Sequence, residues 1–118
     1  MHNFKELKVW QESMKLAKEI FIITKQFPAE EKFGLVSQMR RAIVSVPSNI
    51  AEGSSRKSNK DLNRFLEIAL GSSFELETQL MLSEMFEYLS IEELTKLITT
   101  LNTIQKMIYG FRNKLNVD

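Results

Sequence analysis

Hydrophobic residues recur along the chain at intervals of three and four, which is the spacing of one face of an α-helix. No segment alternates apolar and polar residues as a half-buried strand does, and only four glycines and two prolines interrupt the pattern. The pattern predicts an all-helical chain with helices over residues 3–27, 30–53, 59–88 and 91–115. Because only short connections separate these long segments, we expect an up-down-up-down antiparallel four-helix bundle.

Three of the expected helices begin with a recognisable capping signal. A residue whose side chain can accept a hydrogen bond is followed three positions later by an acidic residue in the pairs Asn3 and Glu6, Ser58 and Asp61, and Ser90 and Glu93. The last pair is flanked by Leu89 and Leu94, which are placed as a hydrophobic staple. The start of the fourth helix is therefore the best defined boundary.

The second expected helix contains a proline. Pro47 removes one backbone hydrogen bond and clashes with the carbonyl of Ile43, so we expect a kink near Pro47, and a complete break is the alternative. We interpret Gly53 as the C-terminal cap of this helix.

The first expected helix is unusually apolar. Its hydrophobic residues cover about half of the helix circumference, more than the ~100° stripe that a single core requires. A monomer would expose a larger apolar patch than soluble monomers tolerate, so we expect an oligomer. Trp10 is the candidate anchor of the apolar interface, and the alternative is that Trp10 is simply buried within one bundle.

Composition limits the chemistry that the chain can perform. Its 118 residues are enough for one domain, and we expect residues 1–118 to form a single bundle. There is no cysteine and the only histidine is His2, so thiol nucleophiles, zinc sites and catalytic triads lack their residues. We therefore predict a protein that is not an enzyme and uses no metal or cofactor. The longest aliphatic and aromatic run, residues 20–23, is far too short to cross a membrane, which favours a cytoplasmic location and no membrane partner.

A second, polar face follows the expected second helix. We call this face the polar stripe, and its residues recur at spacings of three and four: Gln38, Arg41, Ser45, Asn49 and Glu52. One interpretation is a solvated face with hydrogen bonds inside the helix. The other is a partly buried network at a contact between subunits, with Asn49 and Glu52 hydrogen-bonded across helices or subunits.

Charge is unevenly distributed although the net charge is only +1. Residues 1–57 carry a net charge of +4, and residues 58–118 carry −3. If the protein contacts nucleic acid, the candidate residues are the cations near the second helix and the loop that follows it: Arg40, Arg56, Lys57 and Lys60, with Arg41 as a further candidate. The alternative is that these cations only solubilise the loop and offset the acidic third helix.

Several segments of the chain carry a family resemblance. They are residues 4–10 (FKELKVW), 27–30 (FPAE), 34–42 (GLVSQMRRA), 45–53 (SVPSNIAEG) and 65–72 (FLEIALGS). Through these five segments, the chain resembles the bacterial 23S rRNA-intervening-sequence proteins. The resemblance implies a four-helix bundle that assembles as a ring-like homopentamer. The family name records where some of the genes lie and establishes no activity.

A looser resemblance links the chain to the accessory variability determinant of diversity-generating retroelements. That protein is a basic pentameric barrel that binds nucleic acid and a reverse transcriptase. The present chain differs from it in its net charge of only +1. Our leading hypothesis is a non-enzymatic homo-oligomer that acts as an accessory or scaffold protein associated with RNA or DNA. The family resemblance implies that this homo-oligomer is a pentamer. The alternative is a structural or protein-binding module without a nucleic-acid role.

Overall fold

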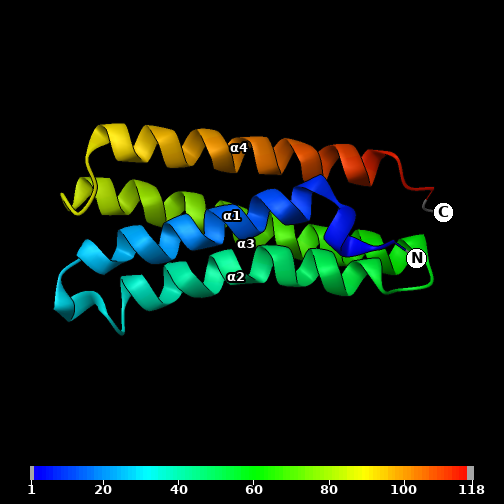
Figure 1. The fold of residues 1–118 in the computed structure, drawn as a ribbon, viewed down its shortest axis with the longest axis horizontal. Coiled ribbons are helices and arrows are strands. Elements are labelled where there is room, and N and C mark those ends of the chain that lie inside the picture. The colour runs from blue at the N-terminus through cyan, green and yellow to red at the C-terminus, as the bar shows by residue number, and fades with distance from the viewer. Residues whose placement is uncertain (1, 117–118) are drawn as a thin grey trace.

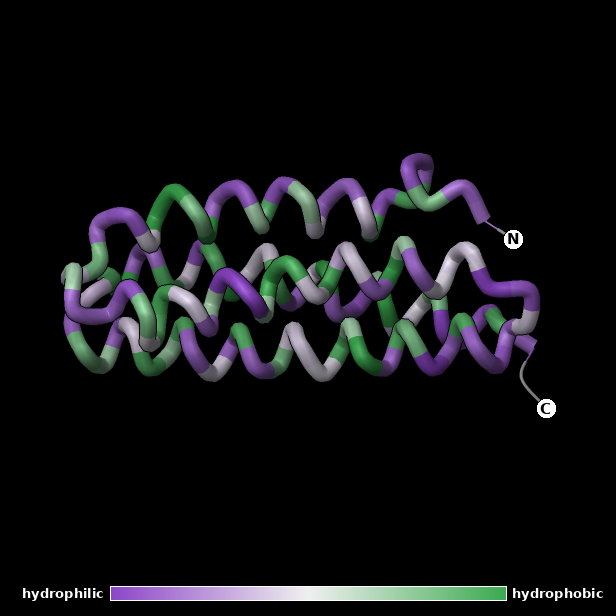
Figure 2. The backbone as a smooth tube through the Cα atoms, turned by 90° about the horizontal axis from the view of Figure 1, so that it is seen from below, coloured by the Kyte–Doolittle hydropathy of each residue, from purple (hydrophilic) through white to green (hydrophobic). Residues whose placement is uncertain are grey.

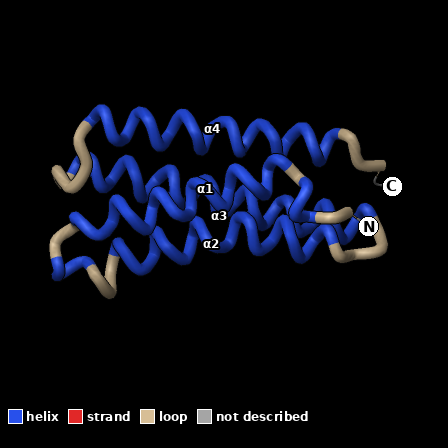
Figure 3. The backbone as a smooth tube through the Cα atoms, in the orientation of Figure 1, coloured by secondary structure: helices blue, strands red, loops and turns tan. Residues whose placement is uncertain are grey.

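A computed structural model describes residues 2–116, and in this range the chain forms helices and no strand (Figure 3). The four α-helices are α1 (Lys8–Ile23), α2 (Leu35–Ser54), α3 (Asn59–Met85) and α4 (Ile91–Asn113). Three short 3₁₀ helices accompany them: η1 (Phe4–Glu6), η2 (Thr24–Gln26) and η3 (Ala29–Glu31). The predicted all-helical, four-helix fold is confirmed.

Successive helices run in opposite directions along a body that measures 45 × 24 × 23 Å (Figure 1). Each helix packs against the next one in the chain, and α4 returns to pack against α1. The contact between α2 and α3 is the most extensive, and the contact between α1 and α4 is the least extensive.

Both ends of the described chain lie beside the connection between α2 and α3 (Figure 1). The His2 amide donates a hydrogen bond to the carbonyl of Ser54 at 3.1 Å. The Asn59 side chain donates one to the carbonyl of Asn116 at 3.3 Å. One end of the bundle therefore carries the two chain ends and this connection.

The core runs along the axis of the bundle. Hydrophobic and hydrophilic positions alternate along each helix, so that one side of each helix can be buried (Figure 2). All four α-helices contribute completely buried large side chains, namely Leu16, Ile20, Met39, Ile43, Val46, Ile50, Leu66, Leu76, Leu80, Leu101, Ile104 and Ile108. Burial of this apolar surface is the main stabilising term of such a fold.

The helix expected over residues 3–27 is divided into η1, α1 and η2. Leu7 is extended, with φ −74° and ψ 123°, and its side chain packs against the core. At the other end, the Thr24 hydroxyl donates to the carbonyl of Ile20 at 2.7 Å, and Phe27 is extended before Pro28. A residue that precedes proline is disfavoured in helical conformation, which explains the exit at Phe27.

The second helix begins later and ends later than expected. Glu30 and Glu31 belong to η3, and α2 starts only after Gly34. Gly53 is not a C-terminal cap, because α2 continues to Ser54 and no glycine in residues 2–116 has a positive φ. The helix passes through Pro47 without a break, which excludes the alternative of a full interruption. The kink near Pro47 stays a prediction.

The starts of the third and fourth helices agree with their capping signals. The Ser58 hydroxyl accepts a hydrogen bond from the Asp61 amide at 3.1 Å. Ser90 and Glu93 form a complete capping box, in which the Ser90 amide donates to the Glu93 carboxylate at 2.8 Å. The third helix ends at Met85 rather than at residue 88, and Glu87 in the following turn is left-handed with φ 64°.

Candidate interaction surfaces

An apolar groove follows the line where α1 and α2 meet. Trp10 and Met14 of α1 and Val44 and Pro47 of α2 form its walls, and its volume is about 370 Å³. Trp10 is half-buried against the core, whereas Met14 and Val44 are 46% and 45% exposed. Trp10 thus packs within its own bundle and also borders an open apolar surface.

The polar stripe is not uniform along α2. Near its middle, the hydroxyls of Ser45 and Ser72 are 2.8 Å apart, which joins α2 to α3. The half-buried Asn49 donates to the carbonyl and hydroxyl oxygens of Ser45 at 2.8 and 2.9 Å, within its own helix. Gln38, Arg41 and Glu52 are exposed. In one chain the cross-helix hydrogen bond is therefore made by Ser45, and the contact between subunits stays a prediction.

Two of the candidate cations already have partners within the chain. Arg40 donates to the Thr24 hydroxyl at 3.0 Å and to the carbonyl of Phe21 at 3.2 Å, and its guanidinium lies 4.6 Å from the centre of the Phe21 ring. Arg56 pairs with Glu52 at 3.2 Å and lies 4.8 Å from the centre of the Phe65 ring. Arg40 therefore helps to hold the end of α1 against α2.

The structure does not bring all the candidate cations together. Arg56 and Lys57 lie in the connection between α2 and α3, and Lys60 lies in the first turn of α3. All three residues are exposed, and we call them the loop cations. Arg40 and Arg41 lie about 20 Å away along α2, as estimated from the rise of an α-helix. The candidate cations thus form two groups rather than one patch.

Arg41 belongs to a separate cleft between α2 and α3, which we call the Phe33 cleft. Its volume is about 390 Å³, and its lining residues are Phe33, Ser37, Gln38, Arg41 and Glu75. Sequence reasoning missed Phe33 and Glu75. A signal for Phe33 is a large aromatic residue in the connection between two helices, directly before Gly34.

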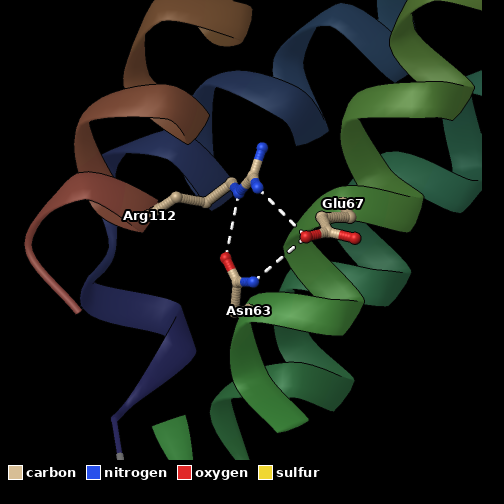
Figure 4. A network of polar contacts seen from close by, with 3 residues as sticks. All are labelled: Asn63, Glu67 and Arg112. Carbon is tan, nitrogen blue, oxygen red and sulfur yellow. Dashed lines mark hydrogen bonds and ion pairs between the residues drawn. The ribbon is translucent and has the colours of Figure 1, made fainter. Parts of the chain in front are cut away.

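Polar groups also join α3 to α4 at the end of the bundle that carries the chain ends (Figure 4). Arg112 donates to the Asn63 side chain at 2.9 Å and to the Glu67 carboxylate at 3.0 Å. Asn63 in turn donates to the same Glu67 oxygen at 3.1 Å, which closes the network. Each of the three side chains is held by the other two, so this network fixes the register of α3 and α4.

The described residues do not supply the elements of a metal centre. Within residues 2–116, no three or more histidine, cysteine, aspartate or glutamate residues are grouped so that they could hold a metal ion. In the same range, no helix combines the length and the apolar character that crossing a bilayer requires.

Sequence and structure comparisons define the class of this protein. The chain belongs to the 23S rRNA-intervening sequence protein family, whose sequence model matches residues 5–110. The structure is similar to the crystal structure of a protein of unknown function from the S23 ribosomal protein family of Bacteroides thetaiotaomicron, with a TM-score of 0.83 and 27% identity. The match covers 90% of this chain and 99% of that one. No curated protein matches the chain significantly.

Proposed function

We propose that the protein is a non-enzymatic, homo-oligomeric bundle that acts in the cytoplasm as an accessory or scaffold for nucleic acid. The observation that carries the proposal is the apolar groove between α1 and α2, with Met14 and Val44 about half exposed. A second copy that covers this groove would remove apolar surface from water, which is the main driving force of association. The resemblance to pentameric relatives makes five copies the expected number.

The assembly is tested by light scattering of the full chain at micromolar concentration. We expect a mass about five times the 13.7 kDa of one chain. Met14→Glu with Val44→Glu should lower this mass, because it places charges in the groove at positions that one bundle leaves exposed. The matched control is Ile22→Glu, the same type of change on the same helix at a residue that borders α4 instead. A wild-type mass near that of one chain would disprove the oligomer.

The nucleic-acid part of the proposal is supported by the loop cations. Lys57 and Lys60 are exposed, and within residues 2–116 neither forms an ion pair. In a ring, every copy would present the same loop, so modest attraction to phosphate at each loop would add up through multivalency.

Binding to structured RNA and to duplex DNA, measured at several salt concentrations, tests this part. Affinity should fall as salt rises, because phosphate contacts release counterions. The triple variant Arg56→Ala, Lys57→Ala, Lys60→Ala should bind more weakly at low salt than the wild type. Unchanged affinity of an intact assembly would exclude the loop cations as the contact.

A structural or protein-binding role is the second candidate. It is favoured by the low net charge of +1 and by the intramolecular partners of Arg40 and Arg56. If the fully assembled protein binds neither RNA nor DNA at low salt, this result would favour the structural or protein-binding role.

A further inference from the structure

Phe33 packs very little against its own chain, although the backbone around it is held in place. The residue is 89% exposed, the largest value among the exposed large hydrophobic residues within residues 2–116. Its neighbour Glu31 accepts a hydrogen bond from the Tyr88 hydroxyl at 2.9 Å and another from the Leu35 amide at 3.3 Å. These bonds connect the loop both to the turn after α3 and to the start of α2. Phe33 is therefore an aromatic surface presented to solvent at a defined position.

The polar residues of the Phe33 cleft converge from two helices. Ser37, Gln38 and Arg41 lie within two turns of α2, and Glu75 comes from α3. Within residues 2–116, the side chains of these four residues take part in no hydrogen bond or ion pair. The cleft thus combines an exposed aromatic ring with a cation, a carboxylate, an amide and a hydroxyl, all available to a ligand.

This set of groups restricts the chemistry of the occupant. A simple anion would meet the charge of Glu75, and a simple cation would meet the charge of Arg41. A flat ring that carries both hydrogen-bond donors and acceptors suits all these groups. It can stack on Phe33, and its edges can form hydrogen bonds with both Arg41 and Glu75. Nucleobases have this combination of properties.

Among the nucleobases, guanine matches the two charged groups best. Its N7 and O6 atoms are acceptors that suit the forked donors of an arginine such as Arg41. Its N1–H and N2 amino groups are donors that suit a carboxylate such as Glu75. A separate cleft of about 300 Å³ has Lys25, Lys32 and Arg40 among its lining residues, and the Lys32 ammonium lies 5.4 Å from the centre of the Phe33 ring. Lys25 and Lys32, which form no ion pair within residues 2–116, are suited to the phosphates on either side of a bound base, whereas Arg40 is already bound to Thr24.

We propose that the Phe33 cleft binds an unpaired guanine nucleotide of a nucleic-acid strand, with the base stacked on Phe33 and its edges read by Arg41 and Glu75. The inference rests on the proposed association with nucleic acid, and it names the kind of nucleotide recognised. It also adds a second contact, about 20 Å along α2 from the loop cations as estimated from the rise of an α-helix. Phosphate attraction at the loop and recognition of a base in the cleft would then be separable properties.

The test compares single-stranded RNAs of about twelve nucleotides, a length within the range of known single-strand sites. One strand is all uridine, and the others carry one central guanine, adenine or cytosine. Fluorescence anisotropy at low salt should show tighter binding of the guanine strand, by about fivefold or more, because a good bidentate contact to a base edge typically discriminates against the wrong base by about that much. Phe33→Ala should remove this advantage, and Glu75→Gln and Arg41→Ala should remove the preference for guanine over adenine. Tyr109→Ala, which removes an exposed aromatic side chain of α4, is the matched control and should have no effect.

The outcomes separate this inference from the proposed function. Binding of all four strands with equal affinity, or a Phe33→Ala variant that keeps the guanine preference, overturns the guanine site and leaves the nucleic-acid role intact. No binding of any RNA or DNA by the wild type overturns both. A lower solution mass of Phe33→Ala by light scattering would show that Phe33 contacts a second copy, which also overturns the guanine site.

Discussion

Gly53 lies against α3, where a side chain would have no room. A Cβ atom at this position would be 2.8 Å from the Cβ of Phe65 and 3.0 Å from the Cδ1 of Leu62. By contrast, a Cβ atom at Gly110 in α4 would meet no atom within 4 Å. Both glycines lie within helices, so they differ in packing rather than in backbone conformation.

We expect Gly53→Ala to destabilise the protein by about 1–3 kcal/mol, because the added methyl group overpacks the α2–α3 contact. This loss should appear although alanine favours a helix by about 1 kcal/mol over glycine. The control Gly110→Ala should stabilise the protein by about 0.5–1 kcal/mol. Urea unfolding of the three proteins measures both effects, and equal stabilisation by the two substitutions would refute the close approach at Gly53.

The network around Arg112 supports a second prediction. Arg112→Ala should lower the free energy of unfolding by about 1–2 kcal/mol, because Asn63 and Glu67 lose their shared partner on α4. The estimate is moderate because the side chains of Arg112 and Glu67 are 27% and 53% exposed. The control Lys15→Ala breaks a more exposed pair with Glu12 and should cost less than about 0.5 kcal/mol. Urea unfolding that gives equal losses for the two variants would mean that the network adds nothing.

At the scale of helices, local and distant interactions define different boundaries. The sequence predicts the starts of α3 and α4 because Ser58 and Ser90 bond amides only three residues away. The start of α2 depends instead on Glu31, whose carboxylate also bonds Tyr88, 57 residues later in the chain. The extended Leu7 likewise depends on packing against the core. Capping signals can be recognised from residues that are close in sequence. The start of α2 and the extended conformation of Leu7 depend instead on contacts that form only in the folded bundle.

The same division between local and distant interactions determines which site residues the sequence could indicate. Helical spacing places Gln38 and Arg41 on one face of α2, and both belong to the Phe33 cleft. Glu75 lies on another helix, so its place in the cleft depends on how α2 and α3 pack. The spacing of residues along the sequence also does not indicate that the Arg40 side chain is hydrogen-bonded to Thr24. Proximity in sequence is therefore a poor guide to which cations are free.

The capping box of α4 makes stability depend on pH. Glu93 accepts a hydrogen bond from the Ser90 amide, and this bond lowers the pKa of Glu93 below its ordinary value of 4.5. The carboxylate therefore contributes its full stability well above pH 4.5, and this contribution is lost as the pH falls through the folded-state pKa.

We therefore expect Glu93→Gln to be less stable than the wild type at neutral pH, with a difference that shrinks as the pH is lowered to about 3. The control Glu92→Gln removes a charge from the same first turn but no hydrogen bond of the capping box. Unfolding free energies at several pH values measure the effect. A difference between Glu93→Gln and the wild type that stays constant with pH would contradict it.

At the scale of the whole molecule, the four helices are unequally packed. The α2–α3 pair has the most extensive contact, and α1 and α4 have the least. Two open clefts lie between α1 and α4, one of about 400 Å³ beside Leu7 and Phe111 and one of about 510 Å³ beside Ile23 and Leu97. Regions with fewer buried contacts open more readily.

Amide hydrogen exchange should therefore be slowest in α2 and α3 and faster in α1 and α4. Within α1, we expect the fastest exchange near Leu7, where the helix begins beside a cleft. Mass spectrometry of peptides from the assembled protein can rank the four helices. Equal protection of all four would mean that the bundle opens only as one unit.

The position of the chain ends has a practical consequence for attaching the molecule to other objects. The His2 amide and the carbonyl of Asn116 are both hydrogen-bonded beside the connection that carries the loop cations. A tag, fused domain or sensor surface joined to either end would crowd Lys57 and its neighbours. The connection between η3 and α2, which contains Phe33, lies at the opposite end of a body 45 Å long and would stay open to solution (Figure 1). Tethering through a terminus would therefore mask the loop selectively, whereas free protein in solution exposes both surfaces.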